Sequence, residues 1–125
     1  MPVARAVTDL LAAYRLDTGA TAELTLLGEP RDLDTAAGTT VVRAVQEALA
    51  NTRKHAPGAA VQVTLTYYPD HVDVAVLDKQ GRRPPQPVTA GYGLRGMRER
   101  VELLDGRLAS GPVEDGWRVH LTVPG

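Results

Sequence analysis

The sequence predicts an α+β fold in which about three helices cover one face of a mixed, mostly antiparallel sheet of about five strands. Two hydrophobic patterns indicate this two-layer sandwich: apolar residues repeat every three or four positions in some segments and alternate with polar residues in others. Alternating segments joined by short turns pair in antiparallel fashion, and helices then cover one face of the sheet. The chain has 125 residues, so we expect one domain that spans residues 1–125.

The first part of the chain predicts a helix, a strand and a second helix. Residues 3–16 carry apolar side chains at helical spacing. Residues 22–26 alternate between apolar and polar side chains before a cluster of turn-forming residues, which predicts a short strand. The longest element is a helix from about Asp34 to Ala56, and a Pro-Gly pair ends it.

The middle of the chain predicts a hairpin followed by a loop. Apolar residues alternate over residues 61–67 and again over 72–76, with a Pro-Asp turn between the two segments. Residues 79–91 contain three prolines and two glycines and show no periodicity. We expect a mobile loop there, and loops of this length within small domains are often functional.

The last part of the chain predicts a third helix and two strands. Apolar residues at helical spacing run from Leu94 to Leu104, and the Asp105-Gly106 pair that follows suits a helix C-terminus. Two strands are expected near residues 107–110 and 117–123. The turn between them is expected to contain three turn-favouring residues: Gly111, Pro112 and Gly116.

Composition excludes several classes of function. Apolar residues make up 43% of the chain and Phe is absent, so the core must be aliphatic. The net charge is −1 with no block of Lys or Arg, which argues against nucleic-acid binding. There is no cysteine, which excludes disulfides and thiolate metal sites and fits a cytoplasmic location. No apolar stretch approaches the roughly 20 residues of a membrane span, so we expect no signal peptide and no membrane contact by this segment.

A narrow polar stripe lies along the second predicted helix. At 100° per residue, Glu47, Asn51 and Lys54 share one side, and the opposite side carries Val41, Val42, Val45, Ala48, Leu49 and Thr52. A solvated helix face explains such a stripe, but Asn is an indifferent helix former that a merely solvated face does not need. An amide oxygen at Asn51 could instead bind Mg²⁺, which prefers hard oxygen ligands. Lys54, about one turn further on, could contact a phosphate.

Asp78 ends the second strand of the predicted hairpin and falls in the phase of its apolar residues. Its carboxylate is therefore expected at the end of the core-facing row. A buried acid needs a hydrogen-bond donor, and the exocyclic amine of adenine is one candidate. A cap or turn at the strand end is the other reading.

The third helix opens on a glycine-rich segment, residues 91–96. Bare backbone amides at the positive end of a helix dipole accept phosphate, although glycines before helices are common. The segment follows a loop and not a strand, so it is not a dinucleotide-binding fingerprint. The three histidines, His55, His71 and His120, are too scattered to suggest a metal site.

Three motifs occur in a specific order: QEALANTRKHA at residues 46–56, Asp78 at a strand end, and GYGLRGMRERV at residues 91–101. Over nearly the whole chain this order resembles the ATP-binding catalytic domain of two-component sensor histidine kinases of the nitrate-sensor and desaturase-sensor class. These belong to the GHKL superfamily, which also contains DNA gyrase and MutL. The resemblance implies a Bergerat fold in which ATP lies between the helices and the sheet, beneath a lid formed by residues 79–90.

The resemblance also implies a role for each motif residue. Glu47 would orient or deprotonate the attacking histidine, Asn51 would hold Mg²⁺ against the triphosphate, Lys54 would contact phosphate and Asp78 would accept the adenine amine. The ring of His55 can approach the same pocket. The expected nucleotide contacts are Asn51, Lys54, His55, Asp78, Gly81, Gly91, Tyr92, Gly93 and Leu94.

The sequence departs from the family after Asp78. The family usually has glycine at the second and often the fourth position after this aspartate, where this chain has Gln80 and Arg82. A shifted turn would let Gly81 take over. This departure bears on ATP affinity, and leaves open a degenerate module that acts only through protein contacts.

The resemblance implies a kinase that transfers the γ-phosphoryl group of ATP to a histidine on a separate dimerisation domain, with a response regulator downstream. No histidine precedes His55, so we expect that the phosphoacceptor segment is absent from this sequence and that the chain is inactive alone. Isolated catalytic domains of this type need not dimerise, so we expect a monomer. A serine kinase of the type that switches anti-sigma factors is a further alternative.

Overall fold

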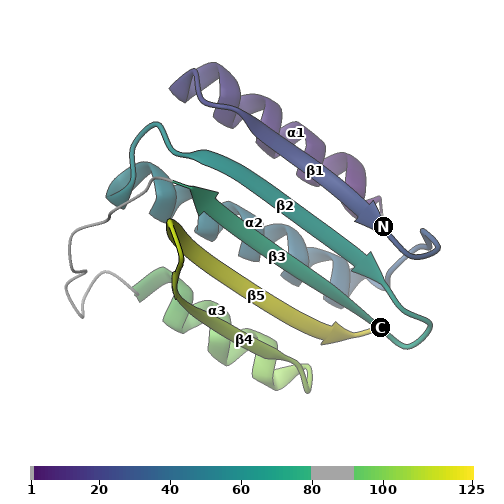
Figure 1. The fold of residues 1–125 in the computed structure, drawn as a ribbon. Coiled ribbons are helices and arrows are strands. Elements are labelled where there is room, and N and C mark those ends of the chain that lie inside the picture. Colours follow the sequence, from purple (N-terminus) through teal and green to yellow (C-terminus); the bar gives the residue numbers. More distant parts are fainter. Residues whose placement is uncertain (1, 80–91) are drawn as a thin grey trace.

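The computed structural model describes residues 2–79 and 92–125. In this part of the chain, three helices lie on one face of a five-stranded sheet (Figure 1), which confirms the predicted α+β sandwich. The helices are α1 (Val3–Thr18), α2 (Thr35–His55) and α3 (Tyr92–Leu103). The strands are β1 (Ala22–Leu27), β2 (Ala60–Tyr67), β3 (His71–Lys79), β4 (Arg107–Val113) and β5 (Gly116–Pro124).

The sheet is mixed and mostly antiparallel, as predicted, with the strand order β1-β2-β3-β5-β4. β1 pairs with β2 in parallel, and α2 makes the crossover connection that a parallel pair requires. All other pairs are antiparallel. β3 therefore lies at the centre of the sheet, where Val76 pairs with Val63 of β2 on one side and with Val119 of β5 on the other.

α2 is the central helix of the second layer and contacts α1, α3, β3 and β5. Its first turn is capped by Asp34, whose side chain accepts a hydrogen bond of 2.8 Å from the Ala37 amide. One face of the helix is buried against the sheet, and its last turn carries three basic residues that suit the negative end of the helix dipole. These residues are Arg53, Lys54 and His55.

The core is mostly aliphatic, as the composition predicted, and it also contains the buried aromatic residues Tyr14 and Tyr67. β2 and β3 pair in antiparallel fashion, which confirms the hairpin, and every second residue of both strands is buried beneath the helices. β1 is covered less completely, because only Ala22 is buried there and Leu26 and Leu27 remain 42% and 49% exposed. No helix among the described residues has the length and apolar character of a membrane span.

The turn between the last two strands differs from the prediction. β4 continues through Gly111 and Pro112 to Val113, and the chain turns at residues 114–115, where Asp115 has a φ of 64°. Gly116 lies within β5, and this position requires glycine because a Cβ atom there would collide with the carbonyl oxygen of Asp78. This glycine therefore permits close strand packing and is not a turn residue.

Candidate functional site

Asp78 lies where the sequence placed it, at the end of the core-facing row of β3. It is only 3% exposed and is flanked by Val61 of β2 and Trp117 of β5. The phase of the strand thus carries a carboxylate into the layer between the sheet and the helices. Burial of a charged group is costly without hydrogen-bond donors, so the surroundings of this carboxylate define the site.

Thr52 of α2 supplies one such donor. Its hydroxyl donates to Oδ2 of Asp78 over 3.1 Å, and the same hydroxyl lies 3.0 Å from the carbonyl oxygen of Ala48. Thr52 is itself only 3% exposed. The bond joins the last turns of α2 to the end of β3, which brings two of the three predicted motifs together. The sequence assigned Thr52 only to the apolar side of the helix, and a threonine within that apolar row was the signal that it does more.

Asn51 precedes Thr52 on α2 and is half-buried. Its side-chain nitrogen Nδ2 is buried, with no hydrogen-bond partner in the described part of the chain. A buried amide is normally hydrogen-bonded, so this side chain has capacity for a ligand. Its amide can present either its oxygen or its nitrogen, because the two atoms exchange by a simple flip.

The other predicted residues of α2 surround Asn51. Glu47, one turn earlier, is half-buried, and Lys54 is exposed, as expected for a stripe opposite the buried face. His55 is half-buried at the end of the helix. The order along this side of α2 is therefore an acid, an amide and a base.

The glycine-rich motif is described only in part. α3 begins at Tyr92, and Leu94 is 7% exposed and belongs to the core. Gly93 lies in the first turn of this helix. Gly81 and Gly91, together with Gln80, Arg82 and the rest of the predicted lid up to residue 90, lie outside the described residues.

An aromatic and cationic cluster holds α1 against the end of α2 that carries Thr52. The hydroxyl of Tyr14 donates to the carbonyl oxygen of Ala59 over 2.7 Å. The guanidinium of Arg53 lies 5.2 Å from the centre of the Tyr14 ring and 3.4 Å from the Asp17 carboxylate. Burial, and secondly the charge of Asp78, raise the pKa of Tyr14 above its ordinary value, which keeps the phenol protonated as a donor.

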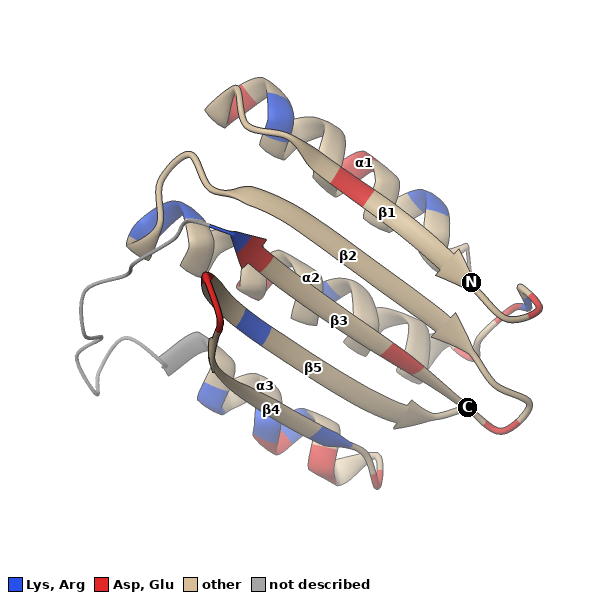
Figure 2. Cartoon of the chain, viewed as in Figure 1, with Lys and Arg blue, Asp and Glu red and all other residues tan. Residues whose placement is uncertain are grey.

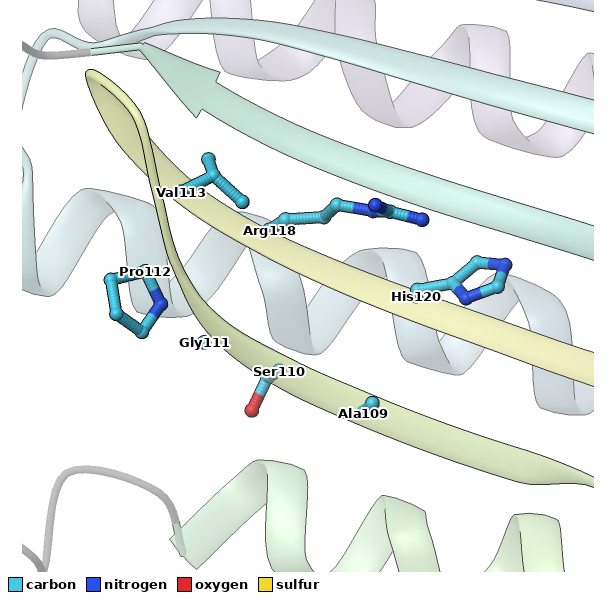
Figure 3. Close-up of a pocket in the computed structure, with 7 residues that line it drawn as sticks. All are labelled: Ala109, Ser110, Gly111, Pro112, Val113, Arg118 and His120. Atoms are coloured by element: carbon cyan, nitrogen blue, oxygen red, sulfur yellow. The ribbon is translucent and has the colours of Figure 1, made fainter.

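Charged residues of both signs are interspersed on the described helices (Figure 2). A hollow of about 240 Å³ is lined by residues of β4 and β5 (Figure 3), and it contains none of the predicted site residues. Its lining residues are Ala109, Ser110, Gly111, Pro112, Val113, Arg118 and His120. The buried polar contacts at Asp78, and not this hollow, therefore define the candidate site.

Comparison with known proteins agrees with the sequence motifs. A scan against protein-family models finds no match. The chain is 30% identical over 125 residues to the signal transduction histidine-protein kinase/phosphatase UhpB of Salmonella typhimurium, an alignment that covers 99% of this chain and 25% of that protein. It is 36% identical over 84 residues to the kinase/phosphatase DegS of Brevibacillus brevis, which covers 66% of this chain and 22% of that protein. The chain thus spans a quarter or less of the length of these relatives.

The fold agrees as well. The histidine kinase domain of the blue-light activated histidine kinase from Erythrobacter litoralis EL346 superimposes with a TM-score of 0.75 at 18% identity, over 99% of this chain and 61% of that one. At this identity the likeness concerns the fold alone, while the sequence relatives carry the family assignment. The chain belongs to the sensor histidine kinases and has the fold of a histidine kinase domain.

Proposed function

We propose that this chain binds Mg²⁺-ATP between α2, the end of β3 and the start of α3, and that it transfers the γ-phosphoryl group to a histidine on a separate dimerisation domain. The observation that carries the proposal is the buried bond between Thr52 and Asp78, next to the half-buried amide of Asn51. The carboxylate of Asp78 on β3 thus lies beside the hydroxyl of Thr52 on α2, and Asn51, the residue before Thr52, carries the amide.

Each group suits one part of the nucleotide. The Asp78 carboxylate only accepts hydrogen bonds, so it matches the exocyclic amine of adenine. The amide oxygen of Asn51 is a hard ligand of the kind that Mg²⁺ takes together with phosphate oxygens and water. Lys54 is exposed and would contact the phosphates, while the backbone amides at the start of α3, with Gly91, Tyr92, Gly93 and Leu94, would receive them.

The residues act mainly by positioning and charge neutralisation, which dominate phosphoryl transfer. When bound, Mg²⁺ would neutralise charge on the phosphate oxygens. Glu47 would orient the incoming histidine and accept its proton. The nucleophile would come from the dimerisation domain, and a response regulator would receive the phosphoryl group in turn. The two relatives named above are histidine kinases, which favours this reading over a serine kinase.

Calorimetric titration tests the proposal. The chain is titrated with ATP and with ADP, each in the presence and absence of Mg²⁺, alongside the variants Asn51→Ala and Gln46→Ala. Gln46 is exposed on the same helix and serves as the matched control. We expect Mg²⁺-dependent binding that Asn51→Ala weakens strongly and Gln46→Ala leaves unchanged. If the chain shows no binding heat and no competition with a fluorescent nucleotide at millimolar concentrations, the proposal is contradicted. The chain would then be a module that acts through protein contacts.

A further inference from the structure

The hydroxyl of Thr52 lies within hydrogen-bonding distance of two acceptors. It lies 3.0 Å from the carbonyl oxygen of Ala48 and 3.1 Å from Oδ2 of Asp78, and it carries a single proton. A threonine inside a helix satisfies its hydroxyl with the carbonyl four residues earlier. The stability of α2 therefore does not require the contact with Asp78, and the role of this contact lies in the site.

The contact fixes the orientation of the carboxylate. A carboxylate group on a strand turns about its last side-chain torsion, which has a broad range of allowed angles. Thr52 has a β-branched side chain on a buried helix face, which restricts the position of its hydroxyl oxygen, 3.1 Å from Oδ2 of Asp78. A donor on Oδ2 sets the plane of the Asp78 carboxylate and hence the direction in which Oδ1 accepts.

We infer that Thr52 is a positioning residue that sets the preference of the site for adenine over guanine. The inference rests on the proposed nucleotide function. A carboxylate held as an acceptor suits the amine at position 6 of adenine. The same carboxylate faces the carbonyl oxygen of guanine with no proton between them, so the pairing is unfavourable. Thr52 maintains this discrimination without contacting the base.

The inference separates the roles of two adjacent residues. Asn51 would act at the phosphate end of the ligand through Mg²⁺, and Thr52 would act at the base end through Asp78. Substitution of Thr52 should therefore change the choice of base and leave the Mg²⁺ dependence intact. Substitution of Asn51 should do the reverse.

The experiment measures dissociation constants for ATP and GTP in the wild-type chain and in the variants Thr52→Val, Thr52→Ser and Thr40→Val. Valine keeps the shape of threonine and removes the hydroxyl, and serine keeps the hydroxyl. Thr40 is the matched control, because it is 9% exposed near the start of the same helix. Thermal unfolding and an amide NMR spectrum establish that each variant folds, and Thr52→Ala replaces Thr52→Val if valine is not accommodated.

We expect the ratio of ATP to GTP affinity to fall about tenfold or more in Thr52→Val, as befits the loss of a hydrogen bond to a charged group. Thr52→Ser should retain most of the wild-type ratio, and Thr40→Val should retain all of it. An unchanged ratio in a folded Thr52→Val chain, or equal losses for both nucleotides, would overturn the inference while the proposed function stands. Failure of the wild-type chain to bind either nucleotide would overturn both.

Discussion

Replacement of Asp78 by asparagine tests the identity of the base-recognition group. Asparagine has nearly the same shape, but its amide offers both a donor and an acceptor. The hydroxyl of Thr52, now 3.1 Å from Oδ2 of Asp78, would donate to the amide oxygen and direct the amide nitrogen toward the base. That nitrogen would oppose the adenine amine and donate to the guanine carbonyl oxygen.

The size of the effect follows from burial. Asp78 is 3% exposed, so water cannot replace the lost acceptor. A hydrogen bond to a charged group contributes about 1.5–3 kcal/mol, which corresponds to about a ten- to hundredfold loss of ATP affinity. GTP affinity should hold or rise. The preference for ATP should therefore disappear in Asp78→Asn.

The assay is competition of ATP and GTP against a fluorescent nucleotide, with Asp73→Asn as the control. Asp73 lies on the same strand but on the opposite face of the sheet, where it accepts a hydrogen bond of 2.7 Å from Thr122. Its substitution should leave both affinities unchanged. Wild-type selectivity in a folded Asp78→Asn chain, or equal affinities for ATP and GTP in the wild-type chain, would refute the assignment of Asp78.

Two further predictions concern activity and stability. Incubated alone with labelled ATP, the chain should take up no stable phosphate. A histidine fixed to the binding helix, such as His55, cannot easily reach the far side of the γ-phosphate. Acid-labile label that vanishes in His55→Ala would contradict this prediction. Tyr14→Phe should lower the free energy of unfolding by about 1 kcal/mol through loss of the bond to Ala59, measured by urea denaturation. Because the folded-state pKa of Tyr14 is raised above 10.0, its contribution is complete below that pH and is lost as pH rises further. The phenylalanine variant should therefore lose less stability than the wild type in alkali, and an equal loss in both would contradict the assignment.

Much of the fold followed from local pattern. The alternation in β2 and β3 predicted their hairpin, because side chains on a strand point to opposite faces by turns, and the same phase carried Asp78 into the core. A mixed sheet was predicted, but the identity of its parallel pair, β1 with β2, was not, since it depends on how α2 crosses the sheet. The turn after β4 was wrong because Gly116 serves a tertiary contact with the Asp78 backbone, which no local pattern records.

The candidate site was predicted in part for the same reason. Helical periodicity placed Glu47, Asn51 and Lys54 on one side of α2, and the structure agrees. Thr52 was assigned to the apolar face because periodicity reports the direction of a side chain and not its partner. That partner, Asp78, is 26 residues further along the chain, so only the packing of α2 against β3 reveals the bond.

The location of the nucleotide site is tested most directly by amide NMR spectra of the isotope-labelled chain, recorded during titration with Mg²⁺ and a non-hydrolysable ATP analogue. The largest shifts should cluster in residues 47–55 of α2 and at the end of β3 around Asp78, and Asp78→Asn should need about ten to a hundred times more analogue to reach the same shifts. Residues 109–113, which line the hollow of β4 and β5, should be unaffected. Shifts confined to that hollow, or no shifts at millimolar analogue, would contradict a nucleotide site between α2 and β3.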